Sequence, residues 1–141
     1  MSAFSILGDE LQKSVTEKIH HTVLEDVAVV ALYFSAKWCG PCQAFTPKLI
    51  SLYNQVNASG KQLEIVYVSG DSDEDQFEEY YGKMPWLAVE FGDNLDVVNE
   101  AYPSEYVPKL TILKKDGSVL IDDASEDVSN RGVACFQDWL K

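Results

Sequence analysis

The chain has 141 residues, of which 46% are hydrophobic and 24% charged, a composition typical of globular proteins and unlike that of disordered or membrane proteins. Its formal net charge of −12 disfavours nucleic acid as a partner, because phosphates require Lys and Arg to replace their counterions. The charge favours basic partners or a cationic small thiol, or it serves only solubility. The longest apolar stretch, residues 27–36, is too short to cross a membrane.

Length and cysteine content predict the domain organisation and the compartment. The length predicts a single domain, residues 1–141, with residues 1–26 as an N-terminal extension that packs on the core. Three cysteines, an odd number, argue against a disulfide framework, and the absence of a second cysteine or histidine pair argues against zinc. No basic segment followed by an apolar one opens the chain, so we expect the cytoplasm, with the nucleus as the alternative.

Apolar patterning predicts alternating strands and helices over the first half of the chain. Residues 1–26 combine helical spacing with turn signals, and short strands are preferred there. Residues 27–34 predict a central strand, apolar on both faces. A helix with an apolar face and a kink at Pro47 follows, and residues 63–69 predict a second strand.

The second half of the chain predicts two further helices, a hairpin and a last helix. Residues 73–81 and 95–102 favour short helices, separated by an irregular link at residues 84–86. Residues 109–113 and 119–121 predict a β-hairpin, and residues 128–140 a final helix that buries Val133, Phe136 and Leu140. The predicted fold class is therefore α/β, with a central mixed sheet flanked by helices and ending in a hairpin and a C-terminal helix.

The motif Trp38-Cys39-Gly40-Pro41-Cys42 lies where the first central strand gives way to a helix. In that position the free N–H groups and positive dipole end of the helix favour an anion, which here is the Cys39 thiolate. Cys42, three residues later, can close a disulfide with Cys39, and Pro41 suits the first helical turn. We therefore predict Cys39 as the nucleophile and Cys42 as the resolving thiol; a chance spacing of two buried structural thiols is the alternative.

Further candidate substrate-binding residues lie beside the cysteines and downstream. Trp38 is expected to be partly exposed and to offer a flat apolar platform, or else to be a packing residue at the rim. At Val107-Pro108 a cis peptide would turn the Val107 backbone outward, where it could pair with an extended substrate. The full set of candidates comprises Trp38, Gly40, Pro41, Asp71, Val107 and Pro108.

Three segments resemble the tryparedoxin and nucleoredoxin branch of the thioredoxin superfamily. Residues 33–39 read Y-F-S-A-K-W-C, residues 45–49 read F-T-P-K-L, and residues 80–88 read Y-Y-G-K-M-P-W-L-A, each similar to a motif of that branch. The resemblance covers roughly residues 27–121. It implies a thioredoxin fold, a cis Pro108 and thiol–disulfide exchange without a bound cofactor.

The chain departs from that branch at several positions. Gly40-Pro41 replaces two prolines, Asp71 alone remains of a Trp-Asp-Glu segment, and Lys109 replaces a Thr after the proline and places a cation near the site. Tyr33 stands where ordinary thioredoxins have an Asp, so proton transfer to or from Cys42 needs water or another group. Trypanothione specificity is therefore not implied, whereas disulfide reduction is.

Two further features have a structural and a functional interpretation. The acidic cluster is either a solvated helix face or a dock for a basic substrate, and it consists of Asp71, Asp73, Glu74, Asp75, Glu78 and Glu79. Cys135 is expected to be a passive thiol in the last helix, with glutathionylation or an intermolecular disulfide as the alternative.

The sequence thus predicts a thiol–disulfide oxidoreductase that reduces protein disulfides through Cys39 and Cys42, with a peroxidase as one candidate acceptor. An upstream thiol or reductase would regenerate the dithiol, and thioredoxin reductase, glutathione and trypanothione all remain open. A redox-regulated binding module without high turnover is the first alternative, and a disulfide-forming oxidant the second. We expect a monomer, because the site must admit protein substrates.

Overall fold

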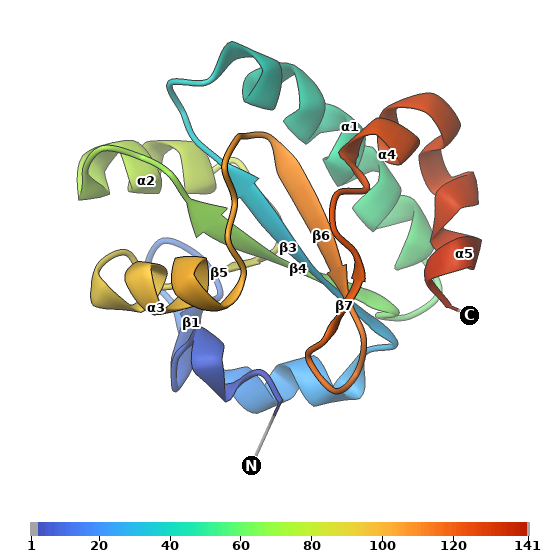
Figure 1. Ribbon diagram of the computed structural model, residues 1–141, viewed down its shortest axis with the longest axis horizontal. Helices are drawn as coiled ribbons and strands as arrows, with labels where there is room; N and C mark the ends of the chain where they lie inside the picture. The colour runs from blue at the N-terminus through green and yellow to red at the C-terminus, as the bar shows by residue number, and fades with distance from the viewer. Residues whose placement is uncertain (1–2, 141) are drawn as a thin grey trace.

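The computed structural model describes residues 3–140, in which seven strands form one mixed sheet of order β2-β1-β5-β4-β3-β6-β7 (Figure 1). In chain order the strands are β1 (Glu10–Gln12), β2 (Lys18–His20), β3 (Val29–Ser35), β4 (Leu63–Ser69), β5 (Leu87–Ala88), β6 (Lys109–Leu113) and β7 (Val119–Ile121). The mixed sheet, flanking helices and terminal hairpin confirm the predicted fold class.

Helices cover both faces of this sheet (Figure 1). The α-helices are α1 (Gly40–Val56), α2 (Glu74–Tyr81), α3 (Asp93–Ala101), α4 (Ser125–Arg131) and α5 (Phe136–Trp139). Three 3₁₀ helices are η1 (Ser5–Leu7), η2 (His21–Asp26) and η3 (Gly132–Cys135). Helices α1, α2, α4 and α5 contribute to the apolar cluster on one face, and α3 packs with the N-terminal segments on the other.

Strand β3 is buried along its whole length because it lies at the centre of the sheet. It pairs in parallel with β4 and antiparallel with β6. Its side chains alternate between the two faces, as the pleat requires: Ala31 and Tyr33 belong to the α1 cluster, whereas Leu32 and Phe34 belong to the α3 cluster. This two-sided burial explains why the segment is a continuous apolar run rather than an alternating one.

Residues 3–26 extend the sheet beyond its central strands. β1 pairs antiparallel with β2 and through Gln12 with Ala88 of β5. Phe4, Leu7 and Leu24 are buried in the α3 cluster, so this segment covers a face that would otherwise be exposed. Strand β5, only two residues long, was not predicted because no periodicity can be detected over so short a segment.

The prediction of one continuous final helix was wrong. Gly132 has a φ of +57°, a left-handed conformation that ends α4 and that glycine adopts without steric cost. The 3₁₀ segment η3 then changes the rotational phase of the chain, so Val133 and Leu140 are 42% and 43% exposed. Phe136 is buried as predicted, together with Cys135 and Trp139.

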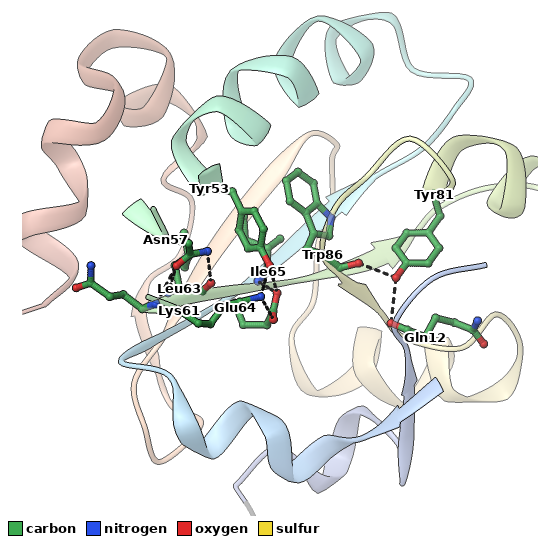
Figure 2. A network of polar contacts seen from close by, with 10 residues as sticks. Gln12, Tyr53, Asn57, Lys61, Leu63, Glu64, Ile65, Tyr81 and Trp86 are labelled. Atoms are coloured by element: carbon green, nitrogen blue, oxygen red, sulfur yellow. Dashed lines mark hydrogen bonds and ion pairs between the residues drawn. The ribbon is translucent and has the colours of Figure 1, made fainter. Parts of the chain in front are cut away.

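The buried carboxylate of Glu64 lies near the start of β4 and bonds to its neighbours (Figure 2). This is the opposite end of the strand from the cysteines. β5 covers only Val66 and Tyr67 of β4, so the Ile65 N–H lies beyond it and donates instead to the Glu64 carboxylate at 3.1 Å. The Tyr53 hydroxyl donates to the same carboxylate at 2.9 Å, and Lys61 pairs with it at 3.1 Å. Glu64 thereby joins α1 to the sheet through its side chain.

Replacing Glu64 by Ala should lower the free energy of unfolding by about 2–4 kcal/mol, because two buried donors lose their acceptor. Urea unfolding followed by circular dichroism measures this. Glu64→Gln keeps an acceptor and should lose less, and Glu78→Ala on the exposed face of α2 should change stability by no more than about 0.5 kcal/mol. Equal stabilities for Glu64→Ala and Glu78→Ala would contradict this role.

Candidate active site

Cys39 is the N-cap residue of α1, directly after the end of β3 and its short connecting turn. The Cys42 N–H donates to Cys39 Sγ at 3.2 Å, which is the bond an N-cap side chain makes to an otherwise unpaired helical N–H. Pro41 occupies the first turn, as predicted, where its missing N–H has no partner to lose. The two cysteines are joined as a disulfide, with Cα atoms 5.2 Å apart.

The two cysteines differ in their exposure. Cys42 is fully buried, whereas Cys39 retains 7% of its surface. Ala36 and Val107 pack against the pair. Cys39 is thus the more accessible of the two, while the roles of Cys39 as nucleophile and Cys42 as resolving thiol stay predictions.

The Val107–Pro108 peptide bond is cis, which confirms what the family resemblance implies. β6 runs antiparallel to β3, with Lys109 paired to Phe34. The start of β6 therefore lies at the same end of the sheet as the end of β3. Val107 therefore faces the cysteines, and its carbonyl oxygen lies 3.8 Å from Cys39 Sγ. Residues that are 68 positions apart in sequence meet here.

Trp38 is 60% exposed, which agrees with the prediction of an exposed platform. Its indole N–H donates to the Gly70 carbonyl at 2.9 Å, just beyond the end of β4. The ring is thus fixed through its polar edge, while its apolar faces stay open to solvent. The preceding residue, Lys37, pairs with Glu79 of α2 at 2.6 Å, an exposed contact.

Asp71 does not belong to the exposed acidic cluster to which the sequence assigned it. It is only 9% exposed, and the protein itself occupies its carboxylate. One oxygen accepts from the Lys37 N–H at 2.6 Å, and the other accepts from the Tyr67 and Ser69 hydroxyls at 2.6 and 2.7 Å. Asp71 therefore fixes the turn that carries Trp38, whereas the remaining acidic residues are exposed, namely Asp73, Glu74, Asp75, Glu78 and Glu79.

A cluster of hydroxyl groups lies behind Cys42, and the sequence analysis missed it. The Thr46 hydroxyl donates to the Cys42 carbonyl at 2.9 Å and contacts the hydroxyls of Tyr33 and Tyr80 at 2.7 and 2.8 Å. The Tyr80 hydroxyl also contacts Ser35 Oγ at 2.9 Å. Burial raises the pKa of Tyr33, so this position stays neutral at physiological pH. The available signal was Thr46 itself, four residues after Cys42 and therefore on the same helix face.

Lys109 lies next to the cis proline, but its charge is not free. The side chain is 6% exposed, its ammonium pairs with Asp122 at 3.0 Å, and it donates to the Pro103 carbonyl at 3.0 Å. These contacts tie the segment before Pro108 to the end of the hairpin. Nearby, Tyr106 is 53% exposed and its hydroxyl donates to Asp123 at 2.8 Å; the sequence analysis did not single it out.

Comparisons with known proteins agree with this geometry. The model of a family described as thioredoxin-like matches residues 26–119. The chain is 43% identical over 112 residues to probable nucleoredoxin 1 of Arabidopsis thaliana. The matched residues cover 78% of this chain and 18% of that protein. Tryparedoxin from Trypanosoma brucei superposes with a TM-score of 0.86 at 30% identity, covering 99% of both chains. The structure of tryparedoxin II complexed with glutathionylspermidine superposes with a TM-score of 0.83 at 27% identity, covering 94% of this chain and 95% of that one.

The fold and the cysteine pair define a thiol-based oxidoreductase class. The chain belongs to the thioredoxin-like family, within its tryparedoxin and nucleoredoxin branch. It spans about a fifth of the length of the Arabidopsis nucleoredoxin that it matches. Within residues 3–140, no three His, Cys, Asp or Glu side chains are grouped to hold a metal ion, and no helix of that region is long and apolar enough to cross a membrane.

The third cysteine should be chemically silent in the folded protein. Cys135 is fully buried, its Sγ lies 3.1 Å from the Gly132 carbonyl, and burial raises the pKa of its thiol. In a titration with Ellman's reagent, the native reduced protein should release two equivalents of nitrothiobenzoate, and a third only in guanidinium chloride. Cys135→Ala should release two under both conditions. Three equivalents from the native protein would show that Cys135 is accessible.

Proposed function

We propose that this chain reduces protein disulfides by cycling Cys39 and Cys42 between dithiol and disulfide. The observation that carries the proposal is the N-cap position of Cys39, where its sulfur accepts the Cys42 N–H at 3.2 Å; the residue is 7% exposed, whereas Cys42 is fully buried. A sulfur in that position is stabilised as thiolate by the helix dipole and by the hydrogen bond. Thiolate is the species that attacks a disulfide.

The reaction proceeds in two exchanges. The Cys39 thiolate attacks one sulfur of the substrate disulfide, forms a mixed disulfide and expels the other substrate sulfur as thiolate, which takes up a proton. Cys42 then loses its proton and attacks Cys39 Sγ, which releases the second substrate sulfur and forms the Cys39–Cys42 bond. Two electrons pass to the substrate, and an external thiol returns them. The Cα separation of 5.2 Å within the pair suits the second step.

The substrate in this proposal lies across the cis-proline segment. In this proposal it contacts Trp38, Gly40 and Pro41 on the side of Cys39, and Val107 and Pro108 on the other side. An extended chain would pair with the Val107 backbone, the mode by which sheet edges bind peptides. Asp71 contributes by holding the Lys37 N–H and thereby the Trp38 turn, rather than through a free carboxylate.

The net charge and the relatives support a choice of electron donor and of electron acceptor. The net charge of −12 favours cationic partners through long-range attraction, and one neighbouring structure is a complex with glutathionylspermidine. We propose a small thiol or a thiol reductase as electron donor and a disulfide protein, such as a peroxidase, as acceptor. A reductase turns over only where a donor restores its dithiol, so we place it in the cytoplasm or nucleus. In this proposal residues 1–141 fold as one domain, act as a monomer and need no bound cofactor.

A redox-regulated binding module is the second candidate. It is favoured by the 43% identity to probable nucleoredoxin 1, because the dithiol state of a nucleoredoxin-like domain can control the binding of a partner without rapid turnover. Two measurements distinguish the two functions: partner binding by Cys39→Ser and turnover of a generic disulfide. Binding that survives Cys39→Ser favours the module, whereas turnover of a generic disulfide such as insulin favours the enzyme.

Trapping in cell lysate tests the enzyme. Cys42→Ser removes the resolving thiol, so Cys39 should remain linked to its substrates as adducts that dithiothreitol releases and mass spectrometry identifies. The double variant Cys39→Ser/Cys42→Ser is the matched control and should capture none of them. Identical adducts from both variants, or insulin reduction no faster than that by Cys39→Ser, would overturn the proposed function.

A further inference from the structure

Two large aromatic side chains beside the cysteines are exposed and yet fixed in position. Trp38 is 60% and Tyr106 53% exposed, although such side chains normally bury most of their surface. Each is tethered at its polar end: the Trp38 indole donates to Gly70 at 2.9 Å, and the Tyr106 hydroxyl donates to Asp123 at 2.8 Å. Tethering holds the exposed apolar surface of each ring in place and lowers the entropy lost when another molecule contacts it.

The two tethers lie on opposite sides of Cys39. The neighbouring strands run in the order β4-β3-β6-β7, and Cys39 and Val107 follow and precede the two middle strands. Trp38 is tied to Gly70 after β4, whereas Tyr106 is tied to Asp123 after β7. Each aromatic residue is also adjacent in sequence to one partner of the Cys39–Val107 contact. The two tethers thus lie on either side of the Cys39–Val107 contact in strand order, one after β4 and the other after β7.

The spacing of strands sets the length of the surface between the two tethers. Strands lie about 4.8 Å apart, so the three intervals from β4 to β7 span about 14 Å. An extended peptide advances about 3.3 Å per residue, so roughly four residues cover that distance. The contact of Cys39 Sγ with the Val107 carbonyl joins the ends of β3 and β6, so it lies near the middle of this span. A substrate cysteine placed there would have the two tethers about two residues before and after it.

The Tyr106 tether is itself well supported. Asp123 also accepts from the Leu110 and Ser125 N–H groups at 3.2 and 3.0 Å, so the acceptor is held by β6 and by the start of α4. The Lys109 ammonium lies 5.9 Å from the centre of the Tyr106 ring, within cation–π range. The hydrogen bond to Asp123 raises the pKa of Tyr106 to about 12, so the hydroxyl remains a donor at physiological pH.

We propose that Tyr106 is a second substrate-contacting residue, which together with Trp38 selects extended segments carrying large apolar side chains about two residues on either side of the reactive cysteine. The inference rests on the proposed reductase function and names its substrate class. Aromatic faces tethered in advance are the surfaces that give most of the energy in protein recognition. The substrate is a protein disulfide in an extended segment. A small disulfide is too short to reach both rings.

A pair of chromogenic peptides tests this. In Ac-Ala-Leu-Ala-Cys-Ala-Leu-Ala-NH₂ and its analogue with Ser for both Leu, the cysteine carries nitrothiobenzoate as a mixed disulfide, and its release is followed at 412 nm. Bis(2-hydroxyethyl) disulfide is the small substrate, and its reduction is followed by the loss of protein thiols. The protein is reduced beforehand and freed of reductant, so that its own dithiol supplies the two electrons in a single turnover. The measured quantity is the ratio of the second-order rate constant for the peptide to that for the small disulfide. For the Leu peptide, Tyr106→Ala should lower this ratio about tenfold.

Three comparisons complete the experiment. Tyr106→Phe keeps the ring and should lower the ratio less than threefold, and Val97→Ala, which shortens a 47% exposed residue of α3, should leave it unchanged. For the Ser peptide the ratio should not depend on residue 106. Tyr106→Ala slowing all substrates equally would indicate a loop-stabilising role and overturn the proposal, as would an unchanged ratio. A wild-type protein no faster than Cys39→Ser on every substrate would instead overturn the reductase function itself.

Discussion

The antiparallel pairing of β3 with β6 is the constraint on which the site depends. β3 ends shortly before Cys39 and α1, and β6 begins directly after the cis proline, Pro108. Because the two strands run in opposite directions, both junctions lie at one end of the sheet. Neither junction alone forms a site: Cys39 needs a neighbouring backbone to hold a substrate, and Val107 needs a reactive sulfur. The 3.8 Å contact between Cys39 Sγ and the Val107 carbonyl is a direct result of this register.

Hydrogen bonds behind the site keep it rigid without placing a free charge beside Cys42. Asp71 is a buried carboxylate, but three donors surround it, and it acts on the Trp38 turn. The hydroxyls of Tyr33 and Thr46 donate to the Cys42 carbonyl, and Tyr80 contacts the Thr46 hydroxyl. Burial raises the pKa of Tyr33. A buried anion at that position would raise the energy of a thiolate at Cys42, whereas neutral hydroxyls carry no such charge.

Local patterns predicted much of the fold and the reactive pair, because the signals involved are contained in short segments. Residues 63–69, 109–113 and 119–121 became strands with the predicted bounds, and the N-cap position of Cys39 follows from its five-residue motif. The burial of Asp71 could not be predicted, because its donors come from β4 and from the turn after β3. Tyr106 was missed for the same reason, since its acceptor lies beyond the hairpin, and Gly132 changed the helix phase through one positive φ.

The two outer strands of the sheet, β2 and β7, are each three residues long, and β7 joins β6 through an irregular register. Short and irregular outer strands resist pairing with a strand from another molecule, which is the route by which sheets polymerise. The sides of this sheet therefore offer another chain only short stretches of backbone to pair with. The feature that limits polymerisation along the sides leaves the end of the sheet, where Cys39 and Val107 meet, as the place to which the proposed function directs an incoming chain.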